Sequence, residues 1–463
     1  MPATSGNFSR RLPWILILSL VVFWSEIVLS SEREVRYLNF AEVAETLRLF
    51  ADSALPGSNI ADSDAWNHWI REQDVEVRAR IDRGVEDSVS NLVLYGTSYT
   101  NLPRLENAES AVTESGEISS AAQARAHALA IALGAATPNE RLRLVRELLA
   151  RKGIAAGEVE RFLTVNLKRF LGEQQGYQKK LEEAGRSGDV REVMLTRGTL
   201  YAERGLSVDT SLLPNYALED TLRSLSTKGV VAAAKIRRIA VIGPGLDFTD
   251  KRDGYDFYPL QTLQPFAVLE AAARLGLGKA EDIQIVTMDL NAAVNSHVAM
   301  LARGARAGKA YPVQLPRDTL ADWNPAAIAY WEHFGEILGK QAKPLPVPKT
   351  LAGVTLRAVA IAPRYASRVA PLNLNIVAQT MDPGEGQGFD LVVATNILVY
   401  YDRLQQALAM ASIAHMMNPG GIFLANNALP AQHVESLEYL GRRTVSYAAS
   451  GAYGDDVVVY RRR

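Results

Sequence analysis

A change of pattern near Lys228 divides the chain into two halves that should fold differently. After Lys235, short β-branched runs alternate with helical segments, which is typical of a mostly parallel sheet with helices on both faces. The expected strands are 238–242, 283–288, 374–379, 391–394 and 422–425. Residues 444–448 and 457–460, joined by a short loop, predict a closing strand pair. We therefore expect a doubly wound α/β domain over residues 228–463.

Residues 32–227 predict an all-α region of unknown function. Thr137-Pro138-Asn139-Glu140 is a capping box with proline at the first helical position, and apolar residues follow it at helical spacing. Four aromatic residues could line a ligand groove, but aromatic residues at such positions more often belong to a core, which is our interpretation. They are Trp66, Trp69, Tyr95 and Tyr99.

Residues 1–31 resemble a targeting segment. Arg10 and Arg11 precede an apolar run, and small residues near Ser30 form a candidate cleavage point. The segment predicts either a cleaved signal peptide or a retained anchor, with membrane association through residues 12–29; a buried helix is the alternative. By the positive-inside rule, this segment would send the rest of the chain outward, to the membrane or beyond it.

Charge and cysteine content exclude several classes of function. Lysine plus arginine total 50 and aspartate plus glutamate 51, so the chain lacks the basic excess of duplex nucleic-acid binders. There are no cysteines, which excludes disulfides, zinc ribbons and thiolate nucleophiles. The six histidines lack the spacing of metal ligands, so no metal site is predicted: His68, His127, His297, His333, His415 and His433.

A Gly-x-Gly turn follows the first expected strand of the sheet. Gly243 and Gly245 lack side chains, so a ligand could approach their backbone amides closely. Phe248 stands where a dinucleotide fingerprint has its third glycine. A tight turn without a ligand remains the alternative interpretation.

Polar residues also follow two other expected strands. Asp289 could accept two hydrogen bonds from a ribose, with Leu290 against a purine, although an aspartate there could equally cap a helix. Thr395 and Asn396 emerge after the strand 391–394, where their side chains could reach a ligand. Because strand ends of a doubly wound sheet gather in one crevice, these residues should face the same ligand.

Together these segments resemble a class I S-adenosylmethionine-dependent methyltransferase of Rossmann-like fold. The resemblance rests on the Gly-x-Gly turn, the acid after the second strand, the runs FDLVVATNILVYYD and MNPGGIFL, and the terminal strand pair, because that family ends its sheet with a hairpin containing its one antiparallel strand. The fourth-strand run is similar to that of chemotaxis receptor methyltransferases. The resemblance covers about residues 228–463 and does not extend to the helical half.

The resemblance implies S-adenosylmethionine as the cofactor and a role for each matching residue. Gly243 and Gly245 would approach its methionine part, Asp289 would bind the ribose and Leu290 would lie against the adenine. Asp382 would hydrogen-bond the adenine amino group, Thr395 would contribute to the cofactor site, and Asn396 would border the methyl-transfer site as the candidate catalytic residue.

The chain also departs from the family pattern. Val241 replaces the acid that usually precedes the first glycine, and Asp247 is a candidate substitute from the other side of the turn. The fourth strand lacks the Asn/Asp-Pro-Pro-Tyr run of amino-group DNA methylases, which disfavours an adenine-methylating enzyme.

Two insertions should flank the crevice. The first, residues 246–258, carries four acids at a three-residue step, which we interpret as solvated rather than cation-binding: Asp247, Asp250, Asp253 and Asp256. The second, residues 297–354, is expected to be a lid that determines substrate specificity.

The sequence thus predicts methyl transfer from S-adenosylmethionine to a small molecule or a protein side chain. The alternatives are an NAD(P)-dependent oxidoreductase and a membrane-anchored, catalytically degenerate nucleotide-binding or scaffold protein. S-adenosylmethionine is a cytoplasmic cofactor, which conflicts with the outward orientation expected from residues 1–31. Nothing in the sequence indicates an oligomeric state.

Overall fold

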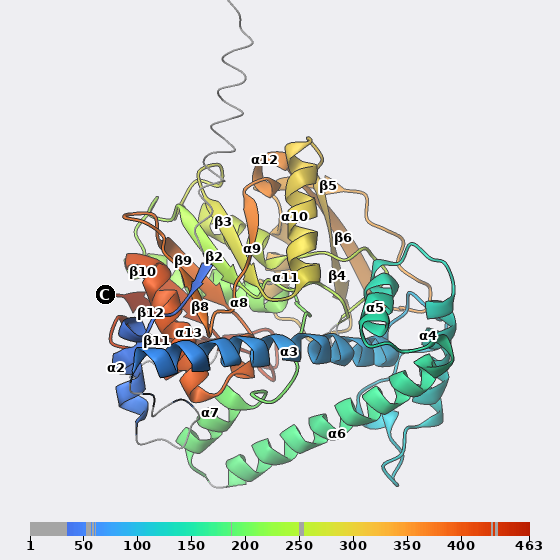
Figure 1. Ribbon diagram of the computed structural model, residues 1–463. Helices are drawn as coiled ribbons and strands as arrows, with labels where there is room; N and C mark the ends of the chain where they lie inside the picture. Colours follow the sequence, from blue (N-terminus) through green and yellow to red (C-terminus); the bar gives the residue numbers. More distant parts are fainter. Residues whose placement is uncertain are drawn as a thin grey trace, which may run out of the picture.

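The computed structural model describes residues 35–51, 57, 60, 62–186, 188–249, 254–426, 429–430 and 434–463. Its centre is a seven-stranded sheet in the order β11-β12-β10-β9-β2-β3-β7 (Figure 1). The strands are β2 (Arg238–Ile242), β3 (Gln284–Asp289), β7 (Val369–Asn373), β9 (Phe389–Ala394), β10 (Met417–Ala425), β11 (Leu437–Ser446) and β12 (Gly454–Arg462).

The first five of these strands in chain order form the parallel part of the sheet. Their spatial order places β2 between β3 and β9, which is the doubly wound arrangement with a switch point beside the first strand. β12 runs antiparallel to both β10 and β11. The predicted fold class and closing hairpin are therefore confirmed.

One predicted strand was wrong. Residues 374–379 do not form the third parallel strand, because β7 pairs with β3 from Val369 to Asn373. β7 carries Pro371 and lies at the edge of the sheet, where a missing N–H costs no ladder hydrogen bond. Beyond it, the carbonyl of Asn375 accepts hydrogen bonds from the amides of Ala378 and Gln379 and so turns the chain.

Helices from both halves of the chain cover the sheet. One core contains residues of α8 (Leu213–Thr227), α9 (Gln264–Arg274) and α10 (Ala292–Arg306). The opposite core combines α13 (Arg403–Met416) with α2 (Phe40–Phe50) and the first part of α3 (Ser63–Tyr95). Trp66 is fully buried in this second core, as expected for a core aromatic residue.

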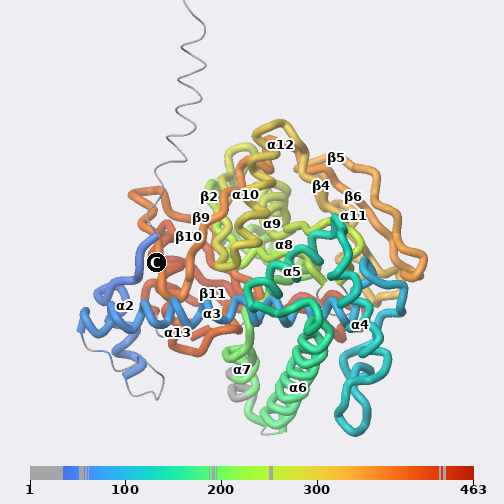
Figure 2. The backbone as a smooth tube through the Cα atoms, turned by 45° about the vertical axis from the view of Figure 1, so that its right-hand side comes forward, coloured from blue at the N-terminus to red at the C-terminus, as the bar shows by residue number. Residues whose placement is uncertain are grey.

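The rest of the helical half surrounds the second part of α3. Its helices are α4 (Ser120–Gly134), α5 (Glu140–Arg151), α6 (Val159–Arg186) and α7 (Val190–Thr199), with short 3-10 turns at Glu109–Ala111 and Ala156–Glu158. Figure 2 shows α3 passing between the sheet and α6 and α7. The predicted all-α character is confirmed apart from β1 (Val35–Tyr37), which pairs with β8 (Gln379–Met381).

The chain between α7 and α8 crosses α3 at very close range. A Cβ on Gly84 would lie 1.7 Å from the carbonyl oxygen of Leu206, and one on Gly205 would lie 2.2 Å from the amide nitrogen of Gly84. Only glycine permits this backbone contact. Residues 205–211, which we call the connecting segment, are thereby held against α3.

The second insertion forms a small antiparallel sheet in the order β4-β6-β5. Its elements are β4 (Tyr311–Asp318), α11 (Pro325–His333), β5 (Gly339–Ala342) and β6 (Val354–Ile361), followed by α12 (Pro363–Ala366). The indole of Trp331 is buried and donates to the carbonyl of Leu315 at 3.0 Å. The insertion therefore has a core shared with α8 and α9.

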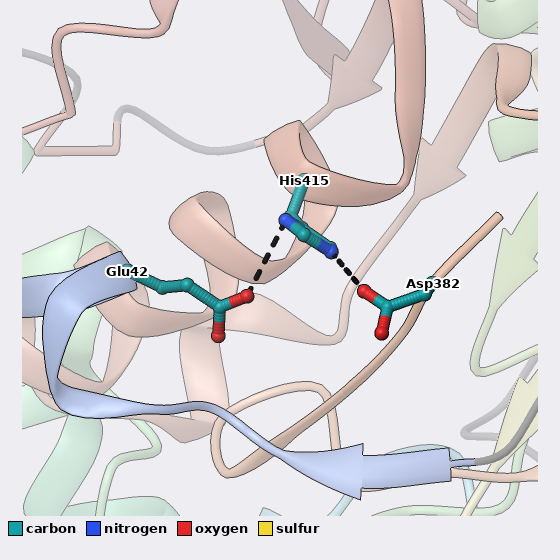
Figure 3. Close-up of side chains that lie close together, drawn as sticks. All are labelled: Glu42, Asp382 and His415. Atoms are coloured by element: carbon teal, nitrogen blue, oxygen red, sulfur yellow. Dashed lines mark hydrogen bonds and ion pairs between the residues drawn. The ribbon is translucent and has the colours of Figure 1, made fainter. Parts of the chain in front are cut away.

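Glu42, Asp382 and His415 gather where β1 meets the sheet half (Figure 3), and their nearest ligand atoms lie within 4.8 Å of one another. Arg36 already occupies this group: its guanidinium lies 2.6 Å from Glu42 Oε1 and 2.7 Å from Asp382 Oδ1. His415 Nε2 lies 2.6 Å from the same Asp382 oxygen. We interpret the cluster as an ion-pair network that holds β1 in place.

This network predicts a pH-dependent contribution to stability. Hydrogen bonds from Arg36 and His415 hold the pKa of Asp382 well below its ordinary value. The carboxylate therefore stabilises the fold above the unfolded-state pKa of about 3.9 and loses this effect as the pH falls further.

We expect Asp382→Asn to lower the melting temperature slightly at pH 7, because partly exposed ion pairs contribute about 0–1 kcal/mol. The difference from the unaltered protein should shrink below about pH 4. Thermal unfolding from pH 3 to 8 measures this, with the exposed Asp282→Asn as the control. A difference that is the same at every pH would contradict the ion-pair interpretation.

Residues 1–34 lie outside the described part of the chain, so the predicted targeting segment is not tested by the structure. In the part that is described, no helix is both long and apolar enough to cross a membrane.

Candidate active site

Two adjoining cavities lie at the carboxyl ends of β2, β3 and β9. The small cavity has a volume of about 50 Å³ and the large cavity about 450 Å³. Both are lined by Ser207, Gly243, Asp289, Ile397 and Tyr400. The switch point of the sheet therefore opens directly onto both cavities, which is where doubly wound folds bind ligands.

The Gly-x-Gly turn forms part of the cavity wall. Gly243 and Gly245 have φ angles of 63° and 64°, a left-handed conformation that glycine adopts without strain. A Cβ on Gly243 would lie 2.2 Å from the Cδ1 atom of Ile397. The turn is therefore built from glycine for two reasons, its backbone conformation and the side chain of Ile397 packed against it.

Asp289 lies at the end of β3, next to this turn. Its carboxylate accepts a hydrogen bond from the amide of Asn291 at 2.7 Å. Burial raises the pKa of Asp289 to about 6, although backbone amides that include Gly245 partly oppose the shift. The helix-cap role is taken by Asn291, whose side chain accepts from the amide of Ala293 at the start of α10. Leu290 lines the small cavity beside Asp289.

Thr395 and Asn396 follow β9 and line the large cavity. The Thr395 hydroxyl accepts a hydrogen bond from Gln264 Nε2 at 2.6 Å. Asn396 has a φ of 57°, which asparagine tolerates better than most residues. Asn426 Oδ1 accepts from the Asn396 amide at 2.7 Å, and Asn426 Nδ2 donates to Asn396 Oδ1 at 2.5 Å. Asn396 is therefore held by Asn426 at the end of β10, and its side chain remains exposed.

Asp247 and Asp256 are not solvated, contrary to expectation. Asp247 accepts from Tyr258 at 2.7 Å and from Gln261 at 2.9 Å, and it lines neither cavity. Asp256 is 2% exposed and accepts hydrogen bonds from the amides of Thr97 and Ser98. Both acids hold the first insertion in place, whereas Asp250 and Asp253 lie outside the described residues.

Two further sequence-predicted positions also lie away from the cavities. Asp382 belongs to the Arg36 network, because the strand expected before it does not exist and residues 379–381 pair with β1 instead. Val241 is fully buried within β2 and lines neither cavity. The predicted site residues that the structure brings together are Gly243, Gly245, Asp289, Leu290, Thr395 and Asn396.

The helical half supplies most of the remaining cavity wall, which sequence reasoning missed. The large cavity is lined by residues of α3, α6, the end of α7 and the connecting segment. None of the residues lining the two cavities comes from 297–354, so the predicted lid position is taken by the helical half. A signal was present in the sequence, since Asp87, Asn91 and Tyr95 recur every four residues on a helix.

The connecting segment also pairs with the Gly-x-Gly turn. The amide of Leu246 donates to the carbonyl of Val208 at 2.7 Å, and a Cβ on Gly245 would lie 2.9 Å from the same oxygen. Asp209 accepts from the Thr249 amide at 3.2 Å. The segment therefore touches α3 on one side and the turn after β2 on the other.

Arg141 of α5 fastens the helical half to the first insertion. Its guanidinium is 2% exposed and donates to the carbonyls of Asp247 at 2.6 Å, of Phe248 and of Tyr258. One side chain thus supplies hydrogen bonds to three backbone carbonyls of the segment that follows the Gly-x-Gly turn.

We expect Arg141→Ala to lower the free energy of unfolding by about 3 kcal/mol or more, because each buried carbonyl left unpaired costs about 1–3 kcal/mol. Urea denaturation measures the change. Arg143→Ala, on the exposed side of the same helix, is the matched control and should change stability by less than about 0.5 kcal/mol. Equal effects of the two substitutions would contradict this role for Arg141.

Comparisons with known proteins yield structural matches only. No protein-family model matches the chain, and no curated protein matches it. The N-methyltransferase NodS from Bradyrhizobium japonicum WM9 is 13% identical, with a TM-score of 0.26, and the match covers 54% of this chain and 97% of NodS.

Two further solved structures are similar at the same level. Magnesium protoporphyrin IX methyltransferase from Synechocystis PCC 6803 with bound SAM is 8% identical, covering 54% of this chain and 79% of that chain at a TM-score of 0.27. The glycopeptide N-methyltransferase MtfA with S-adenosylmethionine is 10% identical, covering 55% and 95% at a TM-score of 0.26.

The strand order of the sheet identifies the fold of the carboxyl-terminal half. The parallel order β7-β3-β2-β9-β10, the glycine turn after β2 and the antiparallel β12 agree with the sheet that the sequence resemblance implied. The carboxyl-terminal half therefore has the doubly wound fold of class I S-adenosylmethionine-dependent methyltransferases.

Proposed function

We propose that the protein transfers a methyl group from S-adenosylmethionine to a small molecule or a protein side chain. The observation that carries this proposal is the convergence of the glycine turn, Asp289 and Asn396 on two adjoining cavities. These groups come from the ends of three different strands, so only the fold brings them together.

The residues at the small cavity fit the nucleoside part of this cofactor. Asp289 supplies a carboxylate that can accept hydrogen bonds from a ribose diol. Leu290, Leu374 and Ile376 supply an apolar surface for a purine ring. A volume of about 50 Å³ is too small for adenosine, so a side chain must move when the nucleoside binds.

Ile397 is the side chain best placed to move. It lines both cavities, lies against Gly243 and is only partly buried. A change of its rotamer would widen the space beside the glycine turn. The turn itself is held by hydrogen bonds from the amide of Leu246 to the carbonyl of Val208 and from the amide of Gly243 to the carbonyl of Met288.

The chemistry asks for positioning more than for acid–base catalysis. The cofactor supplies a methyl group already activated by a positively charged sulfur. The chain's own residues would hold the two reactants in line and exclude water, and such positioning can lower a barrier by several kcal/mol, up to about 7–11 kcal/mol. Thr395 and Asn396 lie where they would contact the reacting groups.

Calorimetric titration tests the proposal. S-adenosylmethionine should bind and NADH should not, and Asp289→Ala should abolish binding. Because the pKa of Asp289 is raised to about 6 in the free protein, affinity should fall below pH 6 as the carboxylate takes up a proton, by about tenfold at pH 5 relative to pH 7. Asp289→Asn should remove this pH dependence.

The other outcomes of the titration identify the alternatives. Binding of NADH alone would favour an oxidoreductase. Binding of neither nucleotide would favour a catalytically degenerate protein, in which Ile397 and the connecting segment close the site.

Ile397→Ala should strengthen the binding of S-adenosylmethionine, by about threefold or more, because the nucleoside no longer has to displace the larger side chain. Calorimetry at pH 7 measures the change. Val399→Ala, a variant of a neighbouring residue that lines the large cavity only, is the matched control. If Ile397→Ala binds S-adenosylmethionine more weakly than the control does, the side chain of Ile397 does not obstruct the nucleoside site.

A further inference from the structure

One face of α3 presents polar side chains to the interior of the protein. Asp87, Asn91 and Tyr95 lie one turn apart, and all three are buried and line the large cavity. A helix packed into a core normally turns apolar residues inward at this spacing. The polar stripe therefore needs an explanation other than core packing.

Asn91 is the unusual member of this stripe. It is 7% exposed, and its amide has no hydrogen-bond partner among the described residues. Because Asn91 lines the cavity and is not among the fully buried unsatisfied groups of the described residues, its amide keeps access to the cavity. Such an amide in a cavity wall can donate a hydrogen bond to a ligand and accept one from it.

The charges around the large cavity disfavour an anionic ligand. Asp87 lies 2.8 Å from Arg204 and 2.7 Å from Arg169, so both of its oxygens are already engaged. Asp209 accepts a hydrogen bond from Ser88 at 2.8 Å. Arg197, the other cation of the lining, is exposed, whereas the carboxylate of Asp209 would repel an anion.

The apolar part of the wall consists largely of aromatic rings. Tyr95, Phe170, Tyr201 and Tyr400 line the large cavity, and the ring centroids of Tyr201 and Tyr400 are 5.8 Å apart. Aromatic rings of this kind pack favourably against a flat ring of a ligand. The volume of about 450 Å³ lies within the usual range for a small-molecule site.

We propose that the large cavity binds the methyl acceptor, that this acceptor is an aromatic molecule without a negative charge that carries a hydroxyl or amino group, and that the Asn91 amide hydrogen-bonds that group. The inference rests on the proposed function, because Thr395 and Asn396 at the floor of the same cavity are the groups placed near the methyl group. An amide both donates and accepts, so it can bind a hydroxyl or an amine.

Three probes test the chemical class, each titrated with and without saturating S-adenosylhomocysteine. Catechol is an uncharged aromatic diol, 3,4-dihydroxybenzoate adds a negative charge, and trans-cyclohexane-1,2-diol lacks the ring. We expect catechol to bind, and the other two to bind at least tenfold more weakly. Absence of catechol binding, or equal binding of either the anion or the ring-less diol, would overturn the inference.

Asn91→Leu tests the role of the amide. The variant should bind catechol at least tenfold more weakly, bind S-adenosylhomocysteine as the unaltered protein does, and have an equal or higher melting temperature. Asn101→Leu, at an exposed loop position outside both cavities, is the matched control. A lower melting temperature would assign Asn91 a structural role, and unchanged catechol binding would remove it from the site; either result overturns the inference.

The two proposals fail in distinguishable ways. If S-adenosylhomocysteine binds and catechol does not, the acceptor inference fails while the proposed function stands. If catechol binds in an Asn91-dependent manner and neither S-adenosylmethionine nor S-adenosylhomocysteine binds, the cavity is a ligand site and the proposed function fails.

Discussion

The backbone contact between α3 and the connecting segment is the constraint on which the site depends. Gly84 and Gly205 bring the two chains closer than any side chain would allow. The same segment then pairs with the turn after β2 through Val208 and Leu246. Because both contacts use the backbone, they place α3 at a defined position over the carboxyl ends of the strands. The wall and floor of the large cavity are thus positioned together.

Buried polar groups reinforce this arrangement and explain why it is specific. Arg141 of α5 donates hydrogen bonds to three carbonyls beyond the glycine turn. The carboxylate of Asp256 accepts hydrogen bonds from the amides of Thr97 and Ser98, which follow the end of α3. An unpaired partner in any of these pairs would be costly, so other relative positions of the two halves are disfavoured. Asn91 differs from these groups, because it lines the large cavity and its amide has no hydrogen-bond partner among the described residues.

Local patterns predicted the elements whose signals are local. β2, β3, β9 and β10 are short apolar runs bounded by turns, and their order predicted the doubly wound sheet. β7 was missed because Pro371 weakens its signal, while the neighbouring residues 374–379 have the apolar alternation of a strand. Asp247 and Asp256 look solvated in sequence, because hydrogen-bond partners from distant elements cannot be seen there. The role given to Asp382 failed with its strand.

The sequence by itself determined the fold class of residues 228–463, the glycine turn, and the positions of Asp289, Thr395 and Asn396 at strand ends. These follow from periodicity and chain order, which are properties of neighbouring residues. Only the tertiary structure decided what covers those strand ends. The predicted insertion packs elsewhere, and α3, α6 and the connecting segment form the wall instead. The physical reason is that burial and close backbone contact between distant segments, such as Gly84 with Leu206, select one packing among many that the same local pattern permits.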